Sequence, residues 1–154
     1  MIVIRVERAK PDQAAEAYAI VEEYYEAVGV VVREDAAEFR KKYFGPGAGI
    51  WLAREDEAVV GCIALRPLEE MAGCGEVKRL YVKPEYRGQG VAERLLEALE
   101  AYAREWGYGA IYLDSKDDLK TAIRFYARHG YADCERYNEN PQATVFMKKE
   151  LGRE

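Results

Sequence analysis

Cysteine and histidine, the residues that most often hold transition metals, are scarce in this chain. There are three cysteines, Cys62, Cys74 and Cys134, and a single histidine, His129. An odd number of cysteines without a Cys-x-x-Cys spacing gives neither a fully paired disulfide framework nor a recognisable zinc site. We therefore expect no bound metal, and thiols that stay reduced, as is usual in the cytoplasm.

The chain also lacks long apolar stretches, a secretory start and an excess of basic residues. No apolar run approaches the roughly 20 residues that span a bilayer. Residues 1–5 have none of the basic start, apolar centre and small cleavage site of a signal peptide. The net charge is −5, whereas a general nucleic-acid binder shows a basic face. We expect a cytoplasmic protein that binds neither membranes nor nucleic acids.

The length and the apolar content predict one domain, residues 1–154, with its own core. The chain has 154 residues, of which 49% are hydrophobic, enough to bury a core without disulfides or metals. Periodicity, prolines and glycines predict an alternation of strands and helices. The expected strands are residues 2–6, 50–54, 58–65, 75–82, 110–113, 131–137 and 144–147. The expected helices are residues 11–28, 35–43, 91–106 and 117–129. This order indicates an α/β domain with a mixed sheet.

A short glycine-rich loop stands between an expected strand and an expected helix. In Arg87-Gly88-Gln89-Gly90, two glycines at the start of a helix let main-chain N–H groups converge on one point. The positive end of the helix and the permanent charge of Arg87 both favour an anion there. The Walker A pattern is absent, and the Gly-x-Gly-x-x-Gly fingerprint fails because Glu93 occupies its third glycine position. The loop predicts a phosphate or pyrophosphate site of another kind.

Two motifs carry a resemblance to one family. Arg87-x-x-Gly90-x-Ala92 resembles the Arg/Gln-x-x-Gly-x-Gly/Ala signature of the GCN5-related N-acetyltransferase (GNAT) family. Further on, Ala122-x-x-Phe125-Tyr126-x-x-x-Gly130-Tyr131 looks like the family's Ala-x-x-Leu-Tyr-x-x-x-Gly-Phe ending. Segments 61–68 and 76–82 are similar to a bacterial branch of small acetyltransferases. The resemblance covers residues 50–150 well, and the first 45 residues only by the order of their elements.

The resemblance implies a single-domain fold and a coenzyme site. The fold is a mixed, mostly antiparallel sheet of about six to seven strands, flanked by about four helices. In the family, the glycine loop holds the pyrophosphate of acetyl-coenzyme A, and the pantetheine arm lies along the fourth strand, bonded to its main chain. The N–H of Val82 is the candidate donor that polarises the thioester carbonyl. The implied coenzyme-binding residues are Leu80, Tyr81, Val82, Arg87, Gly88, Gln89, Gly90, Val91 and Ala92.

Two side chains are the candidate catalytic groups. Tyr126 occupies the family position whose hydroxyl reaches the coenzyme sulfur, and a phenol with a pKa of about 10 still holds a proton at neutral pH. Glu76 begins a charged stretch in an otherwise apolar strand, which indicates a wet groove. A glutamate on this strand of the family often deprotonates the amine, usually through water. The alternatives are that Tyr126 is a core aromatic and that Glu76 forms an ion pair with Lys78 or Arg79.

Two positions depart from the family pattern. Leu119 stands where many members have an asparagine that touches the coenzyme, and Glu93 places a carboxylate close to the phosphate loop. Like charges repel, so a carboxylate there weakens coenzyme binding unless it points away.

The resemblance implies an N-acetyltransferase that acts on a primary amine of a small molecule. Two alternatives stay open: a coenzyme A-binding regulatory module without turnover, and a peptide or protein N-acetyltransferase. Lys78, Arg79 and Arg66 favour an acceptor that also carries an acid group, because cations bind carboxylates and phosphates. The alternative is that these cations pair with Glu76 or face solvent. Whether the protein forms a homodimer is left open.

Overall fold

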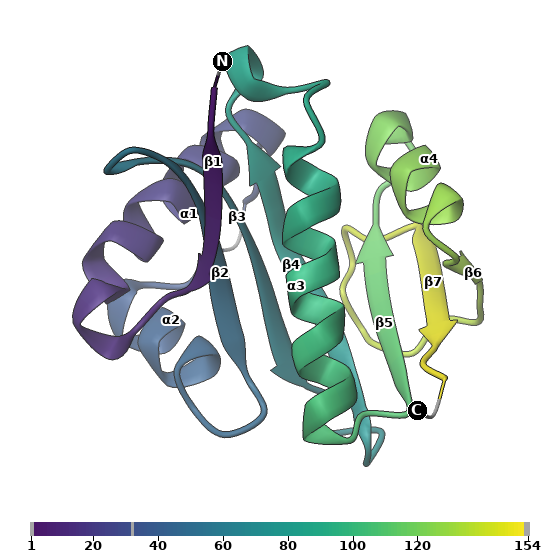
Figure 1. Ribbon diagram of the computed structural model, residues 1–154. Coiled ribbons are helices and arrows are strands. Elements are labelled where there is room, and N and C mark those ends of the chain that lie inside the picture. The colour runs from purple at the N-terminus through teal and green to yellow at the C-terminus, as the bar shows by residue number, and fades with distance from the viewer. Residues whose placement is uncertain (1, 32, 153–154) are drawn as a thin grey trace.

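The computed structural model describes residues 2–31 and 33–152, which form a seven-stranded sheet with helices on both faces (Figure 1). The strands are β1 (Ile4–Arg8), β2 (Gly49–Glu55), β3 (Ala58–Pro67), β4 (Cys74–Val82), β5 (Ala110–Ser115), β6 (Ala132–Asp133) and β7 (Val145–Glu150). The helices are α1 (Ala14–Val28), α2 (Ala36–Tyr43), α3 (Val91–Trp106) and α4 (Lys120–Arg128), with short 3-10 turns at Pro11–Gln13 and Pro84–Tyr86. The expected mixed α/β fold is confirmed.

The sheet is antiparallel except at its centre. Its strand order is β1-β2-β3-β4-β5-β7-β6, and only β4 and β5 run parallel. The connection between these two strands is α3, as a parallel pair requires a crossover. The sheet is thus two antiparallel blocks joined along one parallel seam, and the seam is where the candidate site forms.

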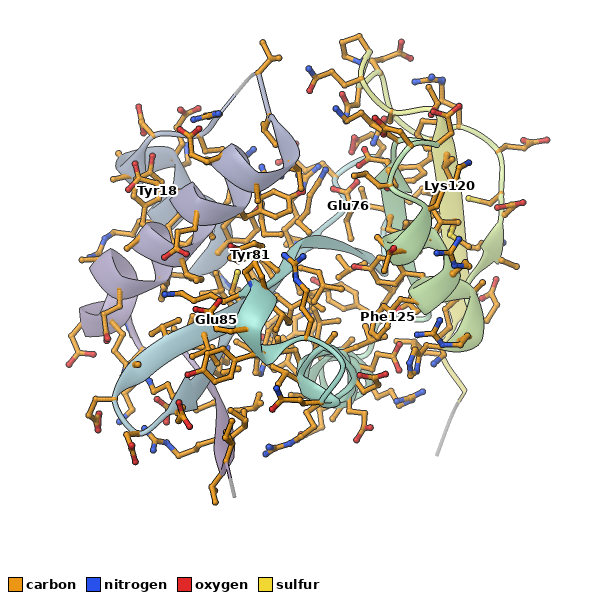
Figure 2. The ribbon with its side chains drawn as sticks, turned by 90° about the horizontal axis from the view of Figure 1, so that it is seen from above. Tyr18, Glu76, Tyr81, Glu85, Lys120 and Phe125 are labelled. Carbon is orange, nitrogen blue, oxygen red and sulfur yellow. The ribbon has the colours of Figure 1, made fainter. Side chains whose placement is uncertain are left out.

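Each face of the sheet has its own apolar core. One core joins α3 and α4 to the sheet through residues such as Leu95, Leu99 and Phe125. The other joins α1 and α2 through Ile20, Phe39 and their neighbours. Seen from above, α1, which carries Tyr18, and α3 lie on opposite sides of the strands (Figure 2). Side chains from the two faces can therefore meet only where the sheet is open.

The seam between β4 and β5 opens after three residue pairs. The parallel register runs only from Cys74↔Ala110 to Glu76↔Tyr112, although β4 continues to Val82. Immediately beyond, the β3–β4 register shifts and Arg79 adopts a φ of 60°, which is unusual outside glycine. The buried thiol of Cys62 donates to the Arg79 carbonyl at 3.1 Å. This bulge turns β4 away from β5 and leaves the ends of both strands facing an opening.

The helices begin and end close to their expected positions. Gly29 and Gly107 close α1 and α3 in the left-handed conformation, and Asp35 caps α2 by accepting a hydrogen bond from the Glu38 N–H. The last helix begins at Lys120 rather than Asp117. Among the described residues, no helix is long and apolar enough to cross a membrane.

Two strand predictions need correction. The first strand is Ile4–Arg8, shifted from the expected residues 2–6, because its register opposite β2 begins at Ile4. The expected strand over residues 131–137 is wrong for most of its length: only Ala132–Asp133 pair with β7 as a strand. The segment then leaves the sheet, because Arg136 bonds the loop carbonyls of Asn138, Asn140 and Ala143.

Candidate active site

The glycine loop is shaped as an anion site at the start of α3. Gly88 and Gly90 have φ values of 76° and 81°, and a Cβ added at either would meet no atom within 4 Å. Gly90 is the N-cap of α3 and offers no side chain to the first N–H groups of the helix. Those donors therefore face open space in front of the loop, which is the arrangement that binds phosphate.

A groove of about 710 Å³ runs from this loop along the end of β4. Eight of the nine expected coenzyme residues line it: Leu80, Tyr81, Val82, Arg87, Gly88, Gly90, Val91 and Ala92. Gln89 is not among the lining residues, and its side chain donates instead to the Glu85 carbonyl at 3.2 Å. Figure 2 shows Tyr81 on the β4 side and Phe125 on the α4 side of the molecule, and both residues line the groove.

The main chain of Val82 faces this groove. The Lys83 N–H bonds the Val60 carbonyl, and Val82 stands opposite Gly61. Since bonded and non-bonded pairs alternate along an antiparallel ladder, the N–H and C=O of Val82 point away from β3. Arg87 Nε donates to the Val82 carbonyl at 2.8 Å, which leaves the Val82 N–H available to a group in the groove.

A second cavity, of about 870 Å³, adjoins the groove on the other side of the seam. Val28, Leu80, Leu119 and Ala122 line both spaces and form an apolar neck between them. Beyond the neck the cavity is charged, with side chains from α1, α2, β4, β5 and the loop after β6. A long ligand in the groove can therefore present its end to a molecule in the cavity through the neck.

Tyr126 stands beside the neck on the cavity side. It lies one helical turn after Ala122 and lines the cavity. Its ring packs against Phe125 and Tyr131, with centroids 5.4 Å away in both cases. Burial first, and then the nearby Tyr24, raise the pKa of Tyr126 above its ordinary value. The phenol thus keeps its proton at neutral pH, as a donor must.

Glu76 is more enclosed than a groove residue. Its side chain has no exposed surface. Arg66 Nε donates to one carboxylate oxygen at 2.8 Å, and the Tyr137 phenol donates to the other at 2.6 Å. Lys78 Nζ is 3.7 Å from the same carboxylate. The ion pair with Lys78 that the sequence offered as an alternative is present, and Arg66 adds a second; any proton must reach Glu76 through an intermediary.

The cations near Glu76 also have partners. Arg79 Nη2 donates to Glu34 at 3.0 Å, and Lys78 donates to Asp114 at 3.4 Å. The Arg79 guanidinium also lies over the rings of Tyr24 and Tyr25. Arg66, Lys78 and Arg79 all line the cavity, but each is held in an ion pair. Among the described lining residues, Lys116 is a cation whose side chain makes no hydrogen bond or ion pair.

The two departures from the family pattern both line the groove. Leu119 lines the neck, so an apolar side chain replaces an amide there. Glu93 lines the groove, with one carboxylate oxygen 4.0 Å from Nε2 of His129. In residues 2–31 and 33–152, no three His, Cys, Asp or Glu side chains are grouped to hold a metal ion.

Sequence reasoning missed several residues of the cavity. Glu34, Asp114 and Asn138 line it, and the carboxylate of Asp114 accepts from Asn138 and Asn140. Burial alone raises the pKa of Asp114, but Lys78 and the two amides more than offset it, so the pKa lies below the usual range. Asp114, at the end of a buried strand, could have been predicted to face the site. The loop residues could not, since their position depends on where β6 and β7 stop pairing.

Comparisons with known proteins agree with this geometry. A family model described as "Acetyltransferase (GNAT) family" matches residues 14–131. An uncharacterised N-acetyltransferase of Schizosaccharomyces pombe is 35% identical over 142 residues, 87% of this chain and 86% of its own length. A GNAT-family acetyltransferase of Staphylococcus aureus has the same fold, with a TM-score of 0.82 and 19% identity over 97% of this chain and all of its own. The PaiA N-acetyltransferase of Thermoplasma acidophilum, solved with coenzyme A, has the same fold too. Its TM-score is 0.72, with 17% identity over 97% of this chain and 99% of its own.

Proposed function

Because the chain belongs to the GNAT acetyltransferase family, we propose that it transfers the acetyl group of acetyl-coenzyme A directly to a primary amine of a small molecule. The observation that carries this proposal is the apolar neck. It joins a groove with an anion-binding loop to a charged cavity, and Tyr126 stands beside it. A thioester in the neck is shielded from bulk water on one side and open to an acceptor on the other.

The coenzyme is held by main-chain groups in this proposal. The N–H groups at Gly88–Val91 and the guanidinium of Arg87 bind the phosphates. The free edge of β4 at Leu80–Val82 binds the pantetheine arm as an added strand. The N–H of Val82 donates to the thioester carbonyl oxygen. Solved relatives of this fold with coenzyme A bound support acetyl-coenzyme A as the co-substrate.

Tyr126 and Glu76 move the protons. Tyr126 donates its phenolic proton to the thiolate as the carbon–sulfur bond breaks. Glu76 accepts the proton of the acceptor ammonium through water, because its carboxylate is buried and does not line the cavity. Lys78 lines the cavity and bridges Glu76 and Asp114, so that proton passes beside Lys78 on its way to Glu76.

The charges of the cavity favour an acceptor that carries an acid group as well as an amine. Six cationic residues line it, Arg33, Lys42, Arg66, Lys78, Arg79 and Lys116, against the four acidic residues Glu34, Glu38, Asp114 and Glu139. Glu76 beside Arg66 and Glu26 beside Arg33 offset the excess of cations, so the acid group is attracted by the Lys116 side chain, and not by a net field or a free arginine fork.

A thiol-release assay tests the proposal. Acetyl-coenzyme A is mixed with amino acids, polyamines, aminoglycosides and peptides, and with amines matched in all but a carboxylate. We expect free thiol with small primary amines, and a lower KM for the carboxylated partner of each pair. A Lys116→Ala variant should remove that preference while leaving kcat for the uncharged partner. Thiol release with peptides alone argues instead for the peptide enzyme, and coenzyme binding without thiol release for any amine argues for the regulatory module.

A further inference from the structure

Tyr24 reaches the neck from the opposite face of the sheet to Tyr126. It lies on α1, one helical turn before the neck residue Val28, and lines the cavity. Tyr126 lies on α4, one turn after the neck residue Ala122. Since α1 and α4 cover different faces, the two tyrosines line one cavity only because the seam between β4 and β5 is open. The neck therefore has a tyrosine at each wall.

The ring of Tyr24 is fixed over the bulged part of β4. The Arg79 guanidinium carbon lies 5.8 Å from its centre, and the Tyr81 ring meets it edge-on at 6.5 Å. Arg79 and Tyr81 flank Leu80 on the same strand that carries Val82, whose N–H faces the groove. Tyr24 thus stands on the β4 side of the neck, where the proposed coenzyme mode places the thioester carbonyl, while Tyr126 stands on the α4 side.

The charged side chains next to Tyr24, namely Arg79, Glu34 and Lys42, carry a net positive charge. Glu34 is shared between Arg79, at 3.0 Å, and Lys42, at 2.7 Å, so the three charges leave a net of one positive. Arg79 is largely buried, so its field is poorly screened. Burial raises the pKa of Tyr24, and the adjacent Arg79 opposes that rise. For Tyr126, by contrast, both burial and its neighbour Tyr24 act in the same upward direction.

We propose that Tyr24 is a catalytic residue whose phenol donates a hydrogen bond to the thioester carbonyl oxygen as negative charge develops there. When the amine nitrogen adds to the carbonyl carbon, the carbon–nitrogen bond forms and the π pair moves onto oxygen. Tyr24 and the Val82 N–H stabilise that oxyanion. The pair then returns, the carbon–sulfur bond breaks, and its electrons leave with sulfur, which takes the proton of Tyr126. The nitrogen, cationic after addition, gives up its extra proton to become the amide, and that proton restores the Tyr126 phenol. Arg79 strengthens Tyr24 as a donor without touching the substrate.

This assignment rests on the proposed acetyl transfer, and a comparison of variants separates the two. Tyr24→Phe should lower kcat by about 10- to 100-fold, since one of two oxyanion donors is lost. Coenzyme A affinity and the melting temperature should stay unchanged. The matched control is Tyr25→Phe, which removes the phenol of the adjacent, fully buried tyrosine that bonds Glu34 but does not line the cavity. It should lower stability and leave kcat within about twofold.

A fluorinated tyrosine at position 24 distinguishes a donor from a wall residue. Ring fluorine makes the phenol more acidic with almost no change of shape, so kcat at neutral pH should be kept or raised. The alkaline limb of the pH profile should move to lower pH, because an ionised phenol cannot donate. Normal kcat in Tyr24→Phe, or a pH profile that fluorination leaves in place, overturns the proposal. If the wild-type protein acetylates no amine, the proposed function itself has failed, and this inference falls with it.

Discussion

The phenol of Tyr137 donates a 2.6 Å hydrogen bond to Glu76, a residue 61 positions earlier in the chain. Tyr137 belongs to the segment that leaves the sheet after β6, and its ring packs edge-on against Tyr112 and Phe146. Burial, and then the Glu76 carboxylate, raise the pKa of Tyr137, so the phenol stays a donor. The bond ties the loop that carries Asn138 and Asn140 to the centre of the sheet.

This bond allows the role of Glu76 to be tested. Glu76→Gln should lower kcat by at least about tenfold near neutral pH, because an amide cannot take the amine proton. Tyr137→Phe is the matched control, because it removes the hydrogen bond and keeps the carboxylate. Steady-state kinetics across pH will decide. Equal losses in the two variants make Glu76 a residue that positions the loop.

The glycine loop provides a test of coenzyme binding. Gly90→Val should reduce coenzyme A affinity below detection by calorimetry, because a branched side chain enters the space in front of the helix N-terminus. It also strains a residue with a φ of 81°, at a cost of about 1–3 kcal/mol. Gly73→Val is the matched control: its φ is 77° and its surroundings are equally open, but it lies in the β3–β4 loop, away from the groove. Unchanged affinity in Gly90→Val means that the phosphates bind elsewhere.

Replacing Tyr126 tests the proton donor. Tyr126→Phe should lower kcat by about 10- to 1000-fold with little effect on coenzyme A affinity, because only a hydroxyl is lost. Since the pKa of Tyr126 is raised, wild-type activity should show no loss from this group below about pH 10. Tyr131→Phe serves as the control, as this buried phenol bonds Glu100 and lies outside both cavities. Normal turnover in Tyr126→Phe means that Tyr126 has only a packing role in the core.

Glu34 should govern stability in acid. Burial alone raises its pKa, but Arg79 and Lys42 more than offset this, and the pKa lies below the model-compound value of 4.5. A carboxylate whose pKa is lowered by folding stabilises the protein above its unfolded pKa, and this contribution is lost as the pH falls through the folded value. Glu34→Gln should therefore cost about 3 kcal/mol at pH 7.

The difference between wild type and Glu34→Gln should shrink as the pH falls below the unfolded pKa of about 4.5, because the unfolded wild-type chain then takes up a proton that native Glu34 still resists. Thermal melts from pH 7 to pH 3 measure it. Glu26→Gln is the control, since this exposed residue pairs with Arg33 at the surface and such pairs contribute little. A Glu34→Gln penalty that stays constant down to pH 3 contradicts an ionised Glu34 in the native protein.

Local sequence was enough for the helices and for the shape of the glycine loop. The positive φ of Gly88 and Gly90, the N-terminus of α3 and the adjacent end of β4 are contiguous in the chain, and local steric rules fix their geometry. The expected ends of the first three helices likewise agree with the observed caps Gly29, Asp35 and Gly107. The length of β6 was not predictable in this way, because pairing with β7 competes with loop bonds made by Arg136.

Only the tertiary structure decided what surrounds the reacting end of the groove. The bulge at Arg79 opens the sheet, and that opening brings Tyr24 of α1 and Tyr126 of α4, from opposite faces, to one neck. It also pairs Glu76 with Arg66 and Tyr137, and Arg79 with Glu34, partners that are distant in sequence. The physical reason is that ion pairs and phenol positions depend on how β4 and β5 diverge. The sequence by itself determined an α/β fold with a glycine loop at a helix N-terminus; the surroundings of the candidate catalytic and acceptor-facing groups came from packing across the seam.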